Sequence, residues 1–326
     1  MLISRFLKVL IFGMLTFIVI KPNQVQAQDP HFSQFYANPL YLNPALAGTH
    51  GCPRLNFNYR NQWPALSGTF VTYSASYDQY FDNLSGGIGV IATLDQAGKG
   101  TINHLTFSFI YAYHLKLGRK WRLIFGAQAT WNQKFLDWDK LSFGDQIDPR
   151  RGFIYNTGDQ PRGGTRGFFD VSAGFVVYNE YFYAGFTAKH LNMPNESMII
   201  GTSKQPIKMT AHMGAEIKFG KGSRYSNTTS LSPNVIFQYQ QGFMELNLGL
   251  YVKYGVIRGG VWWRTNDAFI IMLGLDTKVF KLGYSYDVTI SRLTNASGGS
   301  HEVSLGLYLN CKKKPKGFRT ISCPSF

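Results

Sequence analysis

Ser300, His301 and Glu302 stand together near the end of the chain, and a hydroxyl, an imidazole and a carboxylate are the groups of a hydrolytic triad. They follow Gly298 and Gly299, which signal a turn, and they begin an alternating sequence that indicates a strand. On a strand, His301 and Glu302 point to opposite faces and cannot act on one substrate atom. The sequence His-Glu-Val-Ser-Leu also lacks the second histidine of the zinc-binding pattern His-Glu-x-x-His, which belongs on a helix. We therefore expect the start of a strand here rather than a catalytic site.

The other histidines offer no better chemistry. They are His31, His50, His104, His114, His190 and His212. None of them stands at the spacing that metal ligands require. A barrel hydrolase needs a nucleophile with a nearby base, and the sequence singles out no such pair. We predict no catalytic residue, no metal site and no cofactor.

The N-terminal residues 1–27 have the pattern of a secretory signal peptide. A basic start with Arg5 and Lys8 precedes a chargeless, mostly apolar run at residues 9–20, and Ala27 provides the small residue before the cut. The apolar run is shorter than the roughly 20 residues of a membrane-spanning helix. A retained N-terminal anchor is the alternative. No later segment reaches 18 apolar residues, so no membrane-spanning helix is expected in the mature chain.

From Arg54 to Leu309 the dominant pattern has a period of two. Phe107, Phe109 and Tyr111 share one face, for example, and polar or small residues often occupy the other. About 14 segments of this kind have lengths near the 9–11 residues of a tilted transmembrane strand. The alternation alone would also fit a soluble sandwich.

Two further features favour a membrane barrel over a sandwich. The longest expected connections, 135–167, 192–206 and 288–299, all fall on one side of such a barrel. Aromatic residues near segment ends would form interface girdles, and they are Trp63, Trp121, Trp131, Trp262, Trp263 and Tyr308. We predict an all-β fold, a transmembrane outer-membrane β-barrel of about 14 antiparallel strands at residues 54–309, in contact with outer-membrane lipid. Residues 28–53 precede it and could plug or line its mouth.

The chain is basic, with a formal net charge of +15, and its charged fraction of 16% is low for a soluble domain. Part of the excess lies in a tail at 310–326, expected in the periplasm, whose cations include Lys312, Lys313, Lys314 and Lys316. An acidic lipid, protein or cell-wall polymer could bind such a tail, and nucleic acid is not expected outside the cytoplasm. A solvated tail without a partner is the alternative.

Three cysteines, Cys52, Cys311 and Cys323, have no metal-ligand spacing. An oxidising compartment would permit a Cys311–Cys323 bridge, and a free thiol is the alternative.

The long connection after the fifth expected strand holds two acids and two arginines around a proline and a glycine. The candidate partner-binding residues there are Asp145, Asp148, Arg150, Arg151 and Phe153. Charge-assisted hydrogen bonds could order this loop, and its acids match no defined calcium loop. As an exposed, partly apolar loop it is also a candidate docking surface.

Residues 29–48 read Asp-Pro-His-Phe-Ser-Gln-Phe-Tyr-Ala-Asn-Pro-Leu-Tyr-Leu-Asn-Pro-Ala-Leu-Ala-Gly. This segment resembles the N-terminal signature of the PorP/SprF family of Bacteroidetes outer-membrane proteins. Residues 284–287 and 298–305 resemble its C-terminal signature, and the likeness covers essentially all of the mature chain. The residues that carry the two signatures are Asp29, Pro30, Phe32, Ser33, Gln34, Asn38, Pro39, Asn43, Pro44, Gly48, Tyr284, Tyr286, Asp287, Gly298, Gly299, Ser300, His301 and Glu302.

The resemblance implies a role in the type IX secretion system and associated gliding, with type IX secretion components as partners. Some members of the family link the machinery to a periplasmic peptidoglycan-binding lipoprotein. Others serve the secretion and surface retention of a large adhesin with a type B C-terminal domain. The resemblance carries over no catalytic residue, and the motifs do not decide between the branches. We expect the adhesin-handling role, with the lipoprotein link, a purely structural component and a porin or FadL-like channel as alternatives.

Overall fold

The computed structural model describes residues 29–66, 68–118, 120–141, 144–156, 164–198, 202–219, 229–277, 279–290 and 297–309. The expected signal peptide and the basic tail with Lys312, Lys313, Lys314 and Lys316 lie outside the described residues. No helix within the described ranges is long and apolar enough to cross a membrane.

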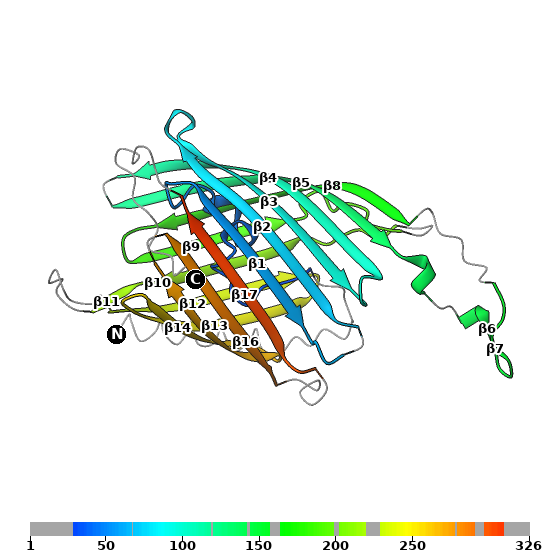
Figure 1. Cartoon of the computed structure of the whole chain (residues 1–326). Helices are drawn as coiled ribbons and strands as arrows, with labels where there is room; N and C mark the ends of the chain where they lie inside the picture. The colour runs from blue at the N-terminus through cyan, green and yellow to red at the C-terminus, as the bar shows by residue number, and fades with distance from the viewer. Residues whose placement is uncertain are drawn as a thin grey trace, which may run out of the picture.

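Alternating residues form fourteen antiparallel strands that close into one barrel (Figure 1), which confirms the predicted fold. The strands are β1 (Arg54–Gln62), β2 (Phe70–Phe81), β3 (Gly86–Ala97), β4 (Ile102–Leu117), β5 (Trp121–Leu136), β8 (Thr165–Tyr178), β9 (Phe182–Lys189), β10 (Lys208–Ala215), β11 (Ile217–Phe219), β12 (Thr229–Gln240), β13 (Phe243–Tyr254), β14 (Ile257–Arg264), β15 (Ala268–Asp276), β16 (Phe280–Thr289) and β17 (Ser300–Tyr308). β10 and β11 are two parts of one strand, since both pair with β12.

The first and last strands pair with each other and complete the ring. Arg54 of β1 lies opposite Tyr308 of β17, and the register continues to Gln62 opposite Ser300. Every strand therefore has two neighbours, and no long edge is left unpaired in the membrane, where an unpaired backbone group would be costly.

The two ends of the barrel differ in the length of their connections. Residues 137–164, 190–207 and 290–299 connect strands at one end, whereas 118–120 and 255–256 connect strands at the other. Long loops face the cell exterior in outer-membrane barrels and short turns face the periplasm. We call these the outer end and the inner end. At the outer end a small hairpin, β6 (Ile147–Asp148) and β7 (Gly152–Phe153), stands away from the barrel (Figure 1).

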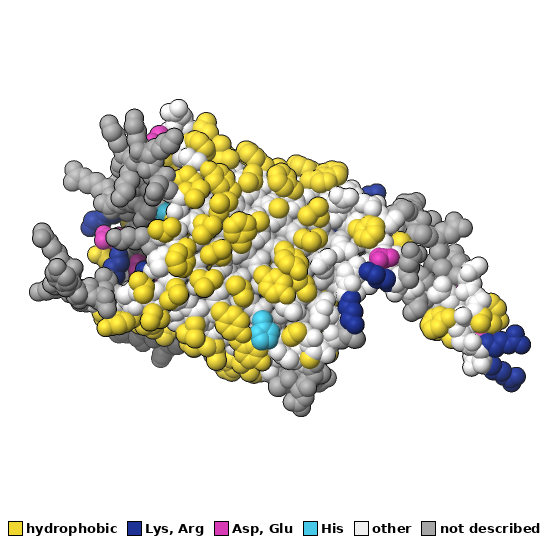
Figure 2. Space-filling view, in the orientation of Figure 1, with side chains coloured by type: hydrophobic (Ala, Val, Ile, Leu, Met, Phe, Trp, Pro, Cys, Tyr) yellow, Lys and Arg dark blue, Asp and Glu magenta, His cyan; other side chains and the backbone are white. Residues whose placement is uncertain are grey.

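Large apolar and aromatic side chains cover the outside of the barrel, as Figure 2 shows for one face. Trp131, Phe107 and Trp263 all point outward, toward lipid. The expectation for Trp262 is wrong, because Trp262 and Trp263 are adjacent on β14 and must face opposite ways. Trp262 points into the lumen, where only 1% of it is exposed.

The inside of the barrel is filled by residues 29–48, which we call the plug. The plug contains a short helix α2 (Pro39–Leu42) and a 3-10 turn η2 (Pro44–Leu46). Proline suits the first position of each because its fixed φ angle matches a helical start and its missing N–H leaves no donor unpaired. The Asn43 side chain accepts a hydrogen bond from the Ala45 N–H at 2.9 Å and caps the second turn.

The plug and the barrel share one apolar core. Phe35, Tyr36, Leu40 and Leu46 of the plug are buried among inward-facing barrel residues. The barrel residues in this core are Ile91, Ile110, Ala112, Ile124, Val176, Tyr178, Tyr183, Ile236, Tyr251, Trp262, Ile270 and Met272. The inward face was expected to be polar, and most of its buried residues are polar, including Asn58, Ser74 and Asn234. The barrel residues of this core are apolar because they pack on the plug rather than facing water.

Glycines of the barrel wall let the plug backbone come close. A Cβ atom built on Gly126 of β5 would lie 2.2 Å from the Ala45 nitrogen. A Cβ atom on Gly87 of β3 would lie 2.7 Å from the Cα atom of Gly48. Backbone atoms cannot yield to such contacts as a flexible side chain does, so these positions accept only glycine while the plug is in place.

The substitution Gly126→Ala should therefore destabilise the plugged barrel. Overpacking of a filled core costs about 1–3 kcal/mol, and we expect a loss of that size in the free energy of unfolding. Urea unfolding of the protein in lipid vesicles measures it. Gly259→Ala is the matched control, since its Cβ atom would meet its nearest atoms at 4.0 Å. Equal stabilities of the two variants would contradict the close approach of the plug.

Candidate functional site

Four buried charged residues form an ion cluster on the lumen side of the barrel. Arg60 of β1 bonds Asp287 of β16 at 2.9 Å and Glu302 of β17 at 3.3 Å. Arg264 of β14 lies 3.5 Å from the same Asp287 oxygen. Charges removed from water need such partners, because an unpaired buried charge costs several kcal/mol. The cluster ties four strands together across the lumen.

The plug enters this ion cluster directly. The backbone N–H groups of Ser33 and Gln34 donate to the two carboxylate oxygens of Glu302 at 2.6 and 3.2 Å. The Ser33 hydroxyl donates to Asp287 at 2.5 Å and accepts hydrogen bonds from both arginines. The Gln34 side chain donates to the Glu302 carbonyl at 2.9 Å and accepts from Ser304 at 2.5 Å. The two sequence signatures, from opposite ends of the chain, therefore meet at one place.

A second ion pair fixes the inner end of the plug. Arg54 bonds Asp78 of β2 at 2.8 Å, and the other Asp78 oxygen accepts the Gly48 N–H at 2.8 Å. Gly48 has a φ angle of +72°, a conformation that glycine adopts without a steric cost. Between the two anchors, Asn38 donates to Ser74 at 2.9 Å, and Asn43 donates to backbone carbonyls of β8 and β9.

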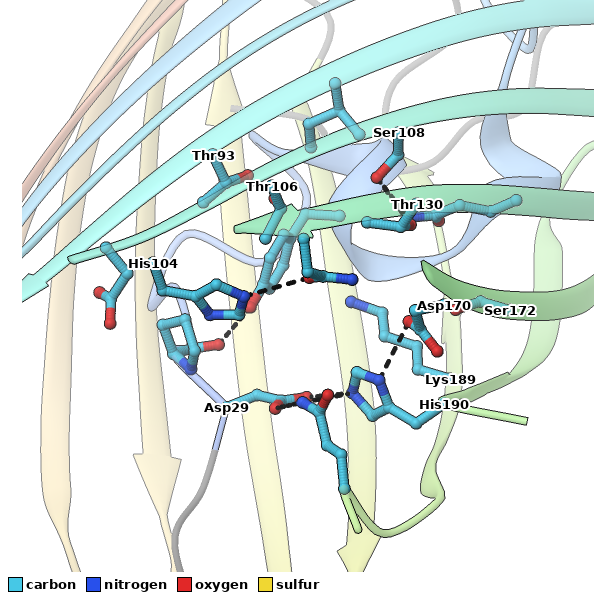
Figure 3. Close-up of a pocket in the computed structure, with 17 residues that line it drawn as sticks. Asp29, Thr93, His104, Thr106, Ser108, Thr130, Asp170, Ser172, Lys189 and His190 are labelled. Carbon is cyan, nitrogen blue, oxygen red and sulfur yellow. Dashed lines mark hydrogen bonds and ion pairs between the residues drawn. The ribbon is translucent and has the colours of Figure 1, made fainter. Parts of the chain in front are cut away.

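The outer end of the plug is held by a group that we call the latch: Asp29, His190, Asp170, Gln205 and Lys208. The two His190 ring nitrogens lie 2.8 Å from Asp29 and 3.0 Å from Asp170 (Figure 3). Gln205 donates to Asp29 at 3.0 Å, and the Lys208 ammonium lies 3.9 Å away. The plug thus runs from the outer end at Asp29 to the inner end at Gly48.

Charge pairing in the latch sets its protonation. Burial of His190 disfavours its charged form, but the carboxylates of Asp29 and Asp170 outweigh burial and raise its pKa to about 9. Burial likewise opposes ionisation of Asp29, and the positive charges of His190 and Lys208 overcome it and hold its pKa well below 3.8. The latch therefore pairs an imidazolium with a carboxylate at neutral pH.

A small polar pocket lies beside the latch, between the plug and strands β3, β4, β5 and β8 (Figure 3). Its volume is about 60 Å³. Several buried polar atoms on its lining have no hydrogen-bond partner within the described protein: Gln128 Oε1, Asn132 Nδ2, Asp170 Oδ1, Ser172 Oγ and Gln205 Oε1. A cavity of this size and polarity suits a few water molecules rather than a drug-sized ligand.

The C-terminal signature divides between the two faces of the barrel. Asp287, Ser300 and Glu302 point into the lumen and are buried. Tyr284, Tyr286 and His301 point outward, and the Tyr284 hydroxyl lies 2.8 Å from His301 Nδ1. Gly298 and Gly299 have φ angles of +67° and +72° in the turn before β17.

The remaining sequence candidates lie in other parts of the structure. The plug contacts described above are made by Asp29, Ser33, Gln34, Asn38, Asn43 and Gly48, and the two turns of the plug begin at Pro39 and Pro44. Tyr41 holds the first plug residues: its hydroxyl donates to the Pro30 carbonyl, and its ring packs edge-on against that of Phe32 at 5.0 Å. Asp145, Asp148, Arg150, Arg151 and Phe153 lie on and beside the β6–β7 hairpin, away from the lumen. Cys52 is disulfide-bonded, and Cys311 and Cys323 lie outside the described residues.

Sequence reasoning missed Arg264, Asp78 and His190 as holders of the plug. Arg264 and Asp78 sit at inward positions of alternating strands, where a charge demands a partner in the lumen. A charged residue at an inward position of a strand could therefore have indicated a contact with the plug. His190 follows β9 in a connection, where alternation assigns no face.

Among the described residues, no group of three or more His, Cys, Asp or Glu side chains is arranged to hold a metal ion. The charged groups that converge on the plug are carboxylates with arginines, a lysine or an imidazolium, and their contacts hold it in the lumen.

The family model described as "Type IX secretion system membrane protein PorP/SprF" matches residues 24–307. The chain belongs to the PorP/SprF family. It is an outer-membrane β-barrel of a type IX secretion system. No curated protein sequence matches the chain.

Solved structures similar to this PorP/SprF protein are outer-membrane barrels. The toluene transporter TbuX of Ralstonia pickettii aligns with a TM-score of 0.46 and 10% identity, over 83% of this chain and 93% of that one. A FadL homologue of Pseudomonas aeruginosa aligns with a TM-score of 0.43 and 11% identity, over 84% and 94%. The outer membrane protein Omp33 of Acinetobacter baumannii aligns with a TM-score of 0.42 and 8% identity, over 79% and 100%.

Removal of one cation from the ion cluster should be strongly destabilising. In Arg60→Met, Asp287 and Glu302 lose their shared partner, and breaking a buried pair costs about 3–5 kcal/mol. The free energy of unfolding in lipid vesicles measures the loss. Lys134→Met is the control. Lys134 pairs with Glu196, and their side chains are 21% and 20% exposed, so this ion pair should contribute at most about 1 kcal/mol to stability. A loss in Arg60→Met no larger than in the control would contradict the cluster's role.

The latch should weaken in alkali. The His190 pKa of about 9 exceeds its ordinary 6.5, so its contribution is full below pH 6.5 and is lost as the pH rises through 9. Asp29 has the opposite sign, and its contribution is lost only as the pH falls through its lowered pKa. Hydrogen–deuterium exchange of residues 29–34, corrected for the intrinsic rate, should show protection falling from pH 6.5 to 9.5. His190→Asn should give low protection at every pH, and an unchanged pH profile in that variant would refute the latch.

Proposed function

We propose that this PorP/SprF protein is a non-enzymatic barrel that binds a large secreted adhesin with a type B C-terminal domain and helps to secrete or anchor it at the cell surface. The filled lumen supports this proposal, since the plug packs against the wall and bonds it at both ends, to the ion cluster through Ser33 and to Asp78 through Gly48. A lumen occupied in this way leaves the outer surfaces of the barrel to act on a partner. Type IX secretion components are the expected neighbours of such a barrel.

The observation that carries the proposal is the outer arm, residues 144–156. Asp148 orders its tip by accepting the backbone N–H groups of Arg150 and Arg151 at 2.8 and 2.9 Å, and those bonds lower the Asp148 pKa. Beside this turn, Phe153, Ile154 and Tyr155 are exposed by 64%, 48% and 55%. Figure 2 shows this arm standing clear of the barrel, with apolar side chains next to basic ones.

Such an arm has the chemistry of a binding site. Aromatic residues and arginines are enriched where proteins bind each other, because they supply large contact areas with few flexible bonds. The arm also stands at the outer end, where a protein arriving at the cell surface would meet it. We infer that the arm contacts an apolar patch on the adhesin, and that acidic groups of the adhesin border this patch and face the arginines of the arm.

A specific feature of the inner end favours a second candidate, the link to a periplasmic peptidoglycan-binding lipoprotein. Lys253, Arg258 and Lys281 all converge on one carboxylate, Asp276, at 2.6, 2.8 and 3.6 Å. This inner rim carries an excess of positive charge, and the basic tail follows the last strand. An acidic lipoprotein surface would complement it. No comparable feature supports a FadL-like channel, since the plug fills the lumen.

Affinity purification of the tagged protein from native membranes, followed by mass spectrometry, tests the proposed function. The wild type should retain a very large secreted protein. The double variant Phe153→Ala with Tyr155→Ala should retain about tenfold less of that protein, the factor for roughly 1.4 kcal/mol of binding free energy. Secretion components and barrel abundance should not change. Tyr181→Ala, an exposed aromatic of a short inner turn, is the matched control. Equal recovery of the large protein by the arm variant would exclude the arm. Recovery of a lipoprotein alone would favour the second candidate.

A further inference from the structure

The outward-facing half of the C-terminal signature takes no part in holding the plug, although it lies on the same strands. Tyr284, Tyr286 and His301 point toward the membrane. His301 lies one residue from the outer end of β17, directly opposite Asn61 of β1. His301 and Tyr286, which lie opposite each other, therefore stand near the outer rim of the lipid-facing surface, and Tyr284 lies below them.

Below this rim the barrel surface is hollowed into an apolar groove of about 430 Å³, which we call the lipid groove. The side chains that form it are Phe57, Tyr59, Tyr73, Ala75, Ala92, Leu94, Leu105, Val303 and Leu305. Its floor is low because Ala75 and Ala92 lie opposite each other on β2 and β3. Its sides are high because the rings of Tyr59 and Tyr73 pack 5.3 Å apart and leucines stand across from them.

The position of the lipid groove fixes the leaflet that it faces. Tyr59, Tyr73 and Val303 each lie three residues from the outer end of their strands. Three residues span about 10 Å along a strand, less than half of the roughly 30 Å hydrocarbon layer. The upper part of the groove thus opens to the outer leaflet, and its apolar lining suits a hydrocarbon chain.

Polar groups above the groove indicate the kind of head group. Asn61 Oδ1 is buried and has no hydrogen-bond partner within the described ranges, so it calls for a donor such as a hydroxyl. His301 Nδ1 is engaged with Tyr284, and its Nε2 has no partner among the described residues and can bond an oxygen. Lys99 is exposed at the tip of the β3–β4 hairpin, five residues beyond Leu94 and on the outer side of the groove, and it attracts anions.

We propose that this face is a binding site for one outer-leaflet anionic glycolipid. An acyl chain occupies the lipid groove, sugar hydroxyls bond Asn61 and His301, and a phosphate approaches Lys99. The outward residues of the signature then have a role of their own, separate from those that hold the plug. This assignment does not depend on which protein partner the barrel binds.

Native mass spectrometry of the intact protein, extracted in mild detergent, tests the proposal. The wild type should retain one glycolipid molecule. The double variant Ala75→Leu with Ala92→Leu fills the lipid groove. It should lower the fraction of protein that carries the glycolipid about tenfold, the factor for roughly 1.4 kcal/mol of binding free energy. The matched control, Ala127→Leu with Ala129→Leu, adds the same groups to the outward face of β5 and should leave occupancy unchanged.

A second variant separates the head group from the chain. Asn61→Ala with His301→Ala leaves the groove intact and should also lower glycolipid occupancy. The proposal is overturned if the groove variant retains the glycolipid as the wild type does. Equal loss in the β5 control would also overturn it, because the lipid would then be annular only. A plain phospholipid bound in place of a glycolipid would overturn the head-group assignment.

Discussion

The constraint on which the structure depends is that a barrel of fourteen strands is too wide to be filled by its own side chains. Eight strands leave an interior that side chains just fill, so a wider barrel contains water, a channel or another segment. In this protein residues 29–48 supply that segment. Where the plug removes wall charges from water, those charges need partners, and the plug provides them through Ser33 and Gln34. Filling and charge pairing are thus two parts of one requirement.

This requirement gives a physical reason for both sequence signatures. The N-terminal signature contains prolines that set its turns, small or amide side chains that bond the wall, and Gly48, which approaches Gly87 closely. The C-terminal signature places Asp287 and Glu302 inside, where they receive the plug. Its alternate residues face lipid. A single stretch of strand therefore serves the plug on one side and the membrane on the other.

Much of the fold could be predicted because alternation is a local property. The period of two locates the strands, and it is sufficient by itself to place His301 and Glu302 on opposite faces. The same rule should have excluded Trp262 from the interface girdle, since Trp263 beside it faces outward. Contacts such as Ser33 with Glu302, 269 residues apart, could not be predicted, because no local pattern encodes which distant segment fills the lumen. Nor does alternation show that Ile110 and Ile124, which it places on the inward face, meet a plug rather than water.

Ion conductance of the purified protein in planar lipid bilayers tests the central claim most directly. The claim is that the plug closes the lumen and that the barrel acts through its surfaces. The intact protein should show no steady conductance under an applied voltage, whereas a variant lacking residues 29–48 should conduct if it inserts as a barrel. Steady single-channel currents through the intact protein would contradict the claim and would favour a transport function.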